Sequence, residues 1–168
     1  MLCEDAAVEW RRTSLATVTR VSRELNNVVV VGASLAGLRA VETLRQEGFD
    51  GAITVIGDEP RAPYDRPPLS KKVLAGEWDP ERIRLRSPEV FAEIRADWQL
   101  GVTATGLDLG ARTVALADGS SGAFDGLVIA TGTRCRRLAD QPDGVHELRT
   151  VDDSLALRDA VAGGGRKV

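Results

Sequence analysis

Hydrophobic and polar positions change period several times along this chain, and the clearest change begins at Val28. Four consecutive valines, Val28 to Val31, lead into the glycine-rich segment GASLAG, residues 32–37. The next residues have helical spacing, because apolar side chains recur every three positions from Leu38 to Leu44, with charged side chains between them. Gly48 then stands where a helix commonly ends. This pattern predicts a buried strand, a tight turn and a helix.

Two later segments predict a further strand and a further helix. Ala52 to Ile56 is an apolar run that predicts a second buried strand. Ser87 is a candidate N-cap and Pro88 suits the first helical position, so a helix is predicted over residues 87–95. We expect this helix to be scaffold.

From Trp98 the alternation becomes that of strands. Residues 102–105 and 113–119 predict a hairpin, a Gly/Ser-rich break follows, and residues 124–131 predict a further buried strand. Because strands alternate with helices before this point, the sequence predicts an α/β fold with a parallel sheet.

The last predicted helix spans residues 151–165. Asp152 or Asp153 is expected to be its N-cap, and a run of glycines is expected to end it. The residues expected to face inward are Leu155, Ala156 and Val161.

The glycine-rich turn after the first strand has the chemistry of a dinucleotide-binding unit. Gly32 permits a sharp turn, Gly37 permits close packing of helix on strand, and the helix N-terminus offers free N–H groups to a pyrophosphate. Ser34 departs from the G-x-G-x-x-G pattern at its middle position, although its hydroxyl is small and can donate a hydrogen bond. Asp58 and Glu59 both lie where such a unit binds a ribose hydroxyl. The alternative is an ordinary glycine-rich turn.

A proline-rich segment follows the second strand. The prolines predict a stiff, extended stretch from Tyr64 to Pro68, after which Leu69 or Ser70 opens a short helix that carries Lys71 and Lys72. Such a stretch can place one cation at a fixed position. The alternative is an exposed loop with ordinary surface lysines.

The segment LVIATGT, residues 127–133, is similar to the first strand and turn, because an apolar strand is again followed by small residues and a glycine. Ala130, Thr131 and Gly132 are small enough for the backbone to approach a ligand, although a simple turn would have the same sequence. His146, the only histidine, is expected at the surface because it follows a turn signal.

Composition mainly excludes classes of function. The chain has 168 residues and a net charge of −3, without a basic stripe for nucleic acid or an apolar run long enough to span a membrane. Cys3 and Cys135 are far apart and lack metal-ligand spacing, so we expect free thiols in the cytoplasm. A redox-active disulfide and a metal site are therefore disfavoured.

Five motifs together resemble a known family. VVGASLAGLRA, ITVIGDE, YDRPPLSK, LVIATGTR and LRT are similar to the flavin-binding half of the ferredoxin reductases of oxygenase systems, in the pyridine nucleotide-disulfide oxidoreductase superfamily. The resemblance implies a Rossmann-like FAD-binding domain with a small antiparallel crossover. It also implies that NADH or NADPH reduces the FAD and that a [2Fe-2S] ferredoxin accepts the electrons.

The resemblance also implies roles for individual residues. Gly32, Ser34, Ala36 and Gly37 would bind the pyrophosphate, and Asp58 or Glu59 the adenosine ribose. Arg66 would flank the FAD and Lys71 would reach the flavin ring. The remaining implied FAD contacts are Ala104, Ala130, Thr131, Gly132 and Arg149.

The expected organisation is a disordered extension over residues 1–25, an FAD-binding domain over 26–165, and the start of an NAD-binding domain at 166–168. On this expectation the FAD domain is incomplete, and the chain alone neither oxidises NADH nor binds FAD tightly. The alternative is a non-catalytic nucleotide-fold module or remnant. The oligomeric state is left open.

Overall fold

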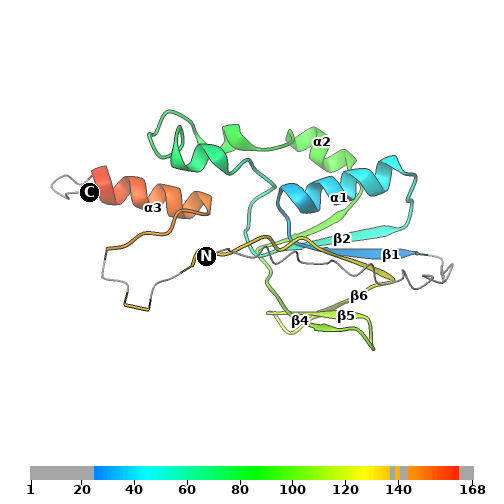
Figure 1. Cartoon of the computed structure of the whole chain (residues 1–168). Helices are drawn as coiled ribbons and strands as arrows, with labels where there is room; N and C mark the ends of the chain where they lie inside the picture. Colours follow the sequence, from blue (N-terminus) through cyan, green and yellow to red (C-terminus); the bar gives the residue numbers. More distant parts are fainter. Residues whose placement is uncertain (1–24, 137–138, 141–143, 163–168) are drawn as a thin grey trace, which may run out of the picture.

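The computed structural model describes residues 25–136, 139–140 and 144–162, which form a four-stranded parallel sheet, a three-stranded antiparallel sheet and flanking helices (Figure 1). Within these ranges no helix is long and apolar enough to cross a membrane. The elements, in chain order, are β1 (Asn27–Val31), α1 (Leu35–Gln46), β2 (Ala52–Gly57), the 3-10 helices η1 (Pro67–Ser70) and η2 (Pro80–Ile83), α2 (Pro88–Glu93), β3 (Asp97–Leu100), β4 (Ala104–Asp108), β5 (Thr113–Leu116), β6 (Ser121–Ala123), β7 (Gly126–Ile129) and α3 (Val151–Ala162).

The parallel sheet has the order β3-β2-β1-β7, so the valine strand is internal. Val28 pairs in register with Ile53 of β2 and with Gly126 of β7. Both faces of β1 are covered, which explains an unbroken apolar run in place of alternation. Val28 and Val30 pack toward α1, whereas Val29 packs toward the antiparallel sheet.

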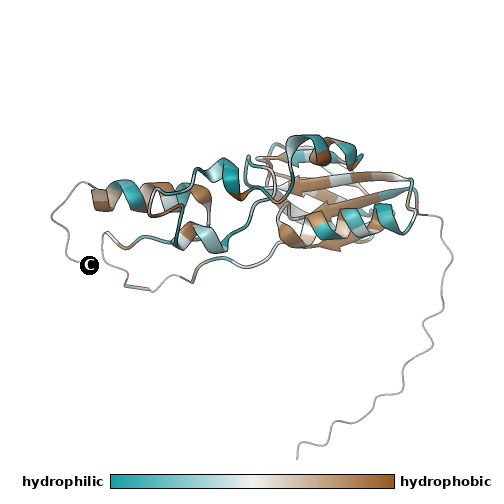
Figure 2. Ribbon diagram, turned by 90° about the horizontal axis from the view of Figure 1, so that it is seen from above, coloured by the Kyte–Doolittle hydropathy of each residue, from teal (hydrophilic) through white to brown (hydrophobic). Residues whose placement is uncertain are grey.

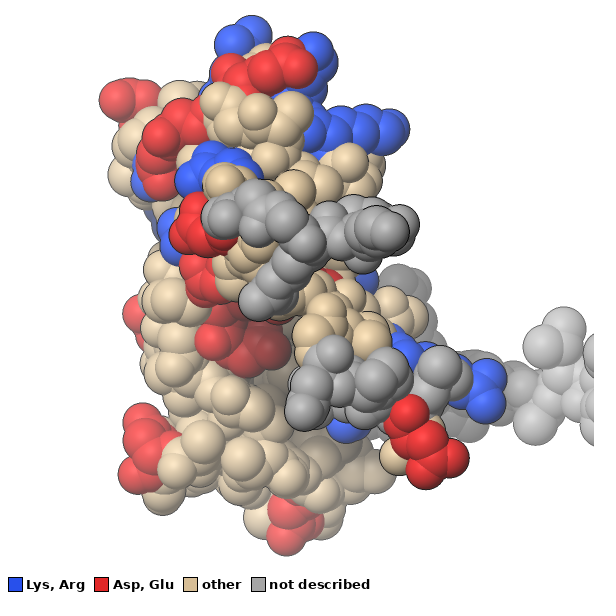
Figure 3. Space-filling view, turned by 90° about the vertical axis from the view of Figure 1, so that its left-hand side faces the viewer, with Lys and Arg blue, Asp and Glu red and all other residues tan. Residues whose placement is uncertain are grey.

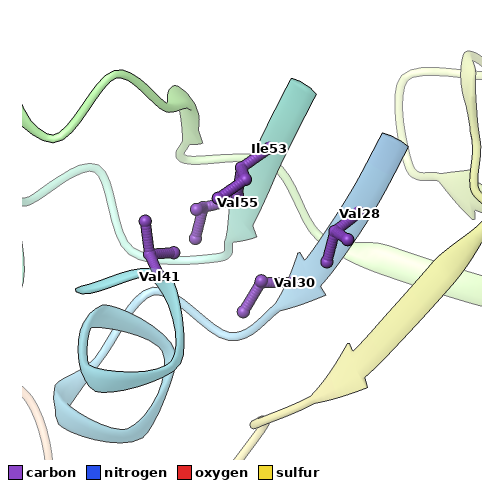
Figure 4. Close-up of a cluster of buried hydrophobic side chains, with 5 residues drawn as sticks. All are labelled: Val28, Val30, Val41, Ile53 and Val55. Atoms are coloured by element: carbon purple, nitrogen blue, oxygen red, sulfur yellow. The ribbon is translucent and has the colours of Figure 1, made fainter. Parts of the chain in front are cut away.

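The core on the helix side is compact. Val41 of α1 points at the strand side chains Val28, Val30, Ile53 and Val55 (Figure 4). All five side chains are buried, and burying each valine or isoleucine contributes about 1.5–3 kcal/mol. This core fixes α1 and the turn that precedes it against the sheet.

The predictions for the strands after α2 need three corrections. Residues 97–100 form β3, which adds to the parallel sheet beside β2 and was not predicted as a strand of that sheet. The Gly/Ser-rich break contains β6, which pairs with β5 through backbone hydrogen bonds and so needs little side-chain propensity. β7 is not fully buried, because it is an edge strand, and Ile129 is 65% exposed.

A second, smaller core lies beside the sheets and is called here the proline-loop core. In Figures 1 and 2, α3 and the 3-10 helices lie to one side of the sheets. Ser154 of α3 donates a buried hydrogen bond to the Leu69 carbonyl at 2.7 Å. The buried residues that define this core are Tyr64, Leu69, Val73, Ile83 and Val151.

The proline-rich segment is less extended than predicted. Arg66 is already in the helical region, with φ −81° and ψ −33°, and η1 begins at Pro67 instead of at Leu69 or Ser70. A fixed φ near −65° suits the first turn of a helix as well as an extended chain. Lys71 and Lys72 follow η1 in turns.

Helix ends are confirmed in one case and corrected in another. Ser87 caps α2, accepting a hydrogen bond from the Val90 N–H, although α2 ends at Glu93. In α3 the capping hydroxyl belongs to Thr150, which accepts from the Asp153 N–H, so neither Asp152 nor Asp153 is the N-cap.

The inward face of α3 also differs from the prediction. Ala156 is exposed and Val161 is 55% exposed, whereas Leu155 is partly buried. The helix contacts the proline-loop core mainly through its first turn, Val151 to Ser154. The predicted glycine end, residues 163–165, lies outside the described residues, as do the predicted extension up to residue 24 and the residues 166–168.

Candidate cofactor site

The glycine turn is closed so tightly that side chains do not fit. Gly32 has φ +118°, and a Cβ there would lie 2.2 Å from the Ala130 carbonyl oxygen. A Cβ on Gly37 would lie 1.8 Å from the Gly32 carbonyl oxygen. Backbone atoms cannot move aside as a flexible side chain can, so both positions require glycine. The first turn of α1 is thereby held against the ends of β1 and β7.

The N-terminus of α1 is open to a ligand. Ser34 is the N-cap residue with extended backbone, but its side chain makes no capping hydrogen bond, and the first turn contains no acidic residue. A helix of 12 residues carries a positive partial charge and free N–H groups at this end. Ala36 is exposed in the same turn. The residues present therefore fit an anionic group such as a pyrophosphate.

A cleft of about 560 Å³ opens beside this turn. It lies where β1, β2 and β7 reach their carboxyl ends, which is where open α/β sheets bind ligands. Five residues predicted from the sequence or from the resemblance line it, together with four that were not assigned to a site. The nine are Gly32, Asp58, Ala104, Thr131 and Gly132, then Val31, Thr103, Thr133 and Arg134.

The two acids after β2 have different environments. Asp58 is exposed and lines the cleft. Glu59 turns away, accepting from Arg66 Nη2 at 2.6 Å and from the Tyr64 hydroxyl. Burial and this hydrogen bond to Glu59 raise the pKa of Tyr64. Of the two acids, only Asp58 lines the cleft.

Arg66 and Arg149 lie together, 83 positions apart in sequence. Arg66 Nη1 donates to the Arg149 carbonyl oxygen at 2.6 Å. A Cβ built on Gly132 would lie 3.1 Å from Arg149 Nη2, so the Arg149 guanidinium lies beside the cleft lining. Neither arginine lines the cleft itself.

Lys71 and Lys72 are both exposed but differ in their partners. Lys72 forms an ion pair with Glu77, whereas within the described ranges Lys71 has no ion pair. Positive and negative side chains are interspersed over the upper part of the face in Figure 3, above the largely uncharged surface of β4–β6. Lys71 is exposed and does not line the cleft.

Other chemistry is sparse in the described part of the chain. No group of three or more His, Cys, Asp or Glu residues there could bind a metal ion. Cys135 is a half-buried free thiol, and Cys3 lies outside the described residues. His146 is exposed, as predicted.

One cleft is lined by a glycine of a turn without side-chain room and by a strand-end acid, and the turn leads into an uncapped helix N-terminus. These features define a Rossmann-like nucleotide-binding domain. Residues 26–166 match the family described as pyridine nucleotide-disulphide oxidoreductase. The chain belongs to this family. Its α/β architecture, with a parallel and a small antiparallel sheet, is that of the FAD-binding domain of reductases.

Two curated relatives are components of dioxygenase systems. The chain is 43% identical over 150 residues to the chlorobenzene dioxygenase ferredoxin reductase component of Cupriavidus sp. (strain PS12), covering 83% of this chain and 36% of the relative. It is 41% identical over 143 residues to the biphenyl dioxygenase ferredoxin–NAD(+) reductase component of Paraburkholderia xenovorans (strain LB400), covering 83% and 35%.

Two solved structures that contain ferredoxin reductases are also similar to this chain. The covalent putidaredoxin reductase–putidaredoxin complex matches with a TM-score of 0.71 and 34% identity, covering 80% of this chain and 34% of that chain. The ferredoxin reductase for the CYP199A2 system from Rhodopseudomonas palustris has a TM-score of 0.74 and 34% identity, covering 82% and 35%. The chain therefore corresponds to the FAD-binding part of ferredoxin reductases and spans about a third of their length.

Proposed function

We propose that this chain is the FAD-binding part of an NAD(P)H-dependent ferredoxin reductase. The observation that carries the proposal is the cleft at one edge of the sheet, which is lined by Asp58 and by Gly32 of the turn that leads into the uncapped N-terminus of α1. These groups are complementary to a pyrophosphate and to a ribose hydroxyl. Membership of the family supports FAD as the ligand, because FAD is a cofactor of this family.

The chain's own residues bind and orient the cofactor. Ser34, Ala36 and Gly37 would present backbone N–H groups and the helix dipole to the pyrophosphate. Gly32 contributes the tight turn instead, because its own N–H donates to the Ile56 carbonyl at 2.8 Å. Asp58 accepts from the adenosine ribose. Ala104, Ala130, Thr131 and Gly132 would contact the rest of the cofactor, and Lys71 and Arg149 would supply positive charge towards its flavin.

FAD, when bound, supplies the redox chemistry by which a two-electron donor can reduce a one-electron acceptor. We propose NADH or NADPH as the donor and a [2Fe-2S] ferredoxin as the acceptor in the whole protein. The support is that several relatives are named as ferredoxin–NAD(+) reductase components of dioxygenase systems, and that one solved relative is in complex with putidaredoxin.

The binding proposal is tested with FAD titrated into the purified chain and followed by flavin fluorescence. Asp58→Asn should weaken binding about tenfold or more, because a hydrogen bond to a charged group contributes about 1.5–3 kcal/mol. Asp97→Asn, an exposed acid on β3, is the matched control and should bind like the parent. Equal affinities for the parent and Asp58→Asn would contradict the assignment.

The role of Lys71 is tested in the reductase that carries this segment. A cation near the flavin favours the negatively charged reduced ring, so Lys71→Met should lower the midpoint potential. Lys72→Met is the control, because Lys72 is already paired with Glu77. Equal shifts in both variants would remove the assignment.

A further inference from the structure

Glu59 and Arg66 make contacts that a direct role at the cofactor does not explain. Both side chains are about three-quarters buried, with exposed fractions of 22% and 25%. Glu59 faces Arg66 and the Tyr64 hydroxyl, and Arg66 uses its second nitrogen on the Arg149 carbonyl. Each of these groups is occupied by protein, and neither residue lines the cleft.

The backbone at Arg149 is held from both sides. Its carbonyl accepts from Arg66, and its N–H donates to the Asp153 carboxylate at 2.9 Å. The next N–H, that of Thr150, donates to the same carboxylate at 2.8 Å. The side chain of Arg149 lies next to Gly132, which lines the cleft.

We infer that Glu59 and Arg66 are positioning residues, which act on the cofactor site by fixing the backbone of Arg149 and hence the place of its guanidinium. The inference rests on the proposed function for its cofactor, FAD. It assigns Asp58 and Glu59, which are adjacent in sequence, to different tasks: Asp58 to the ribose and Glu59 to the arginine pair.

The planar guanidinium of Arg66 is needed to bond Glu59 and the Arg149 carbonyl at the same time. One nitrogen donates to Glu59 and the other to the Arg149 carbonyl, so one guanidinium joins the end of β2 to the segment before α3. The ammonium of lysine is a single point of charge and cannot reproduce both bonds with the same geometry. Arg66→Lys should therefore behave like a loss of the bridge.

The first experiment needs no cofactor. Amide hydrogen exchange of the purified chain is compared for the parent, Glu59→Gln and Arg66→Lys. Exchange at Arg149 and Thr150 should become about tenfold faster in both variants, since a hydrogen bond to a charged group is lost or weakened. Unchanged exchange at these two amides would overturn the inference.

The matched control is Glu42→Gln. Glu42 is also a carboxylate shared by two arginines, Arg39 and Arg86, and its side chain is 12% exposed, but it lies on α1 and does not line the cleft. It should leave exchange at Arg149 and Thr150 unchanged. Faster exchange at these amides in this control would show general loosening and would also overturn the inference.

The second experiment is a double-mutant cycle, which tests whether Glu59 affects FAD binding through Arg149. Glu59→Gln should weaken FAD binding about fivefold in the parent, and less than twofold when Arg149→Met is already present. Equal factors in both backgrounds, or no effect of Arg149→Met alone, would overturn the inference. Failure of the parent to bind FAD would instead contradict the proposed function, and the exchange experiment would still decide whether the pair holds Arg149.

Discussion

The two halves of the proposed cofactor site are built in different ways. The glycine-turn region, residues 27–57, is one continuous stretch whose strand, turn and helix pack on each other. The proline-loop core joins segments that are far apart: Ser154 bonds Leu69 across 85 positions, and Arg61 pairs with Asp152 across 91. The proposed pyrophosphate end of the site is therefore set locally, whereas the end proposed to lie near Lys71 and Arg149 depends on long-range packing.

The two regions should consequently respond differently to substitution. In the glycine turn an added side chain would meet backbone atoms, which have no room to relax. In the proline-loop core a smaller side chain would leave a cavity or an unpaired polar atom while the sheet stays intact. The following predictions test this difference, from the largest expected effect to the smallest.

Gly37→Val should be the most damaging single change. Its Cβ would lie 1.8 Å from the Gly32 carbonyl oxygen, and so the turn, α1 and β1 could not keep their packing. We expect a loss of more than about 4 kcal/mol in the free energy of unfolding, measured with urea. Gly122→Ala is the control, because its Cβ would find its nearest neighbour at 3.9 Å. A stable Gly37→Val variant that binds FAD like the parent would contradict the placement.

Leu69→Ala should damage the proline-loop core without reaching the sheet. Leu69 is 2% exposed, and such a truncation costs about 2–5 kcal/mol. Hydrogen exchange should become faster in α3 and remain slow in β1. The control is Leu109→Ala, at a residue that is 73% exposed. Equal acceleration in α3 and β1 would show that the two regions unfold as one unit.

Ser154→Ala tests a single bond between the distant segments. The Ser154 side chain is fully buried and donates to the Leu69 carbonyl at 2.7 Å. Its removal leaves a buried acceptor unpaired, at a cost of about 1–3 kcal/mol in unfolding free energy. Ser70→Ala, at an exposed serine in η1, should change little. A neutral Ser154→Ala would mean that water or another donor replaces the hydroxyl.

The smallest predicted effect is a pH dependence at the start of α3. Burial opposes ionisation of Asp153, but hydrogen bonds from the Thr150 and Arg149 N–H groups hold its pKa below the ordinary value. A lowered folded-state pKa stabilises the fold above the unfolded value of about 3.9, and this contribution is lost as the pH falls through the folded pKa.

The measurement is urea unfolding between pH 7 and pH 3 for the parent and Asp153→Asn. The parent should lose stability relative to the variant as the pH falls below about 4, because the variant has no carboxylate to protonate. If the stabilities of the two proteins changed in parallel across this range, the Asp153 carboxylate would not stabilise the start of α3.

Sequence was a good guide wherever the signal was contiguous. The β1–turn–α1 unit, β2 and the Ser87 cap all follow from neighbouring residues, and so each could be predicted without knowledge of the rest of the chain. The position of Asp58 at the cleft follows in the same way, because the ends of parallel strands meet at one edge.

What sequence missed depends on distant partners. β6 forms because β5 offers backbone hydrogen bonds, not because its own residues favour strands. Strand alternation was recognised from Trp98, but the pairing of β3 with β2 was not, because it depends on a distant partner. The sequence left Asp58 and Glu59 equivalent, since only the folded position of Arg66 separates them. Thr103 and Thr133 also line the cleft, and the one available signal was their place next to Ala104 and Gly132.

The most direct test of the central claim is a competition experiment on the purified chain. FAD is titrated in, and ADP, which shares its pyrophosphate and adenosine ribose, is added as competitor, with FMN titrated separately. Because Asp58 lines the cleft and the α1 N-terminus follows the glycine turn beside it, we predict that ADP displaces FAD and that FMN binds at least tenfold more weakly than FAD. FMN binding as tightly as FAD, with no displacement by ADP, would contradict the account.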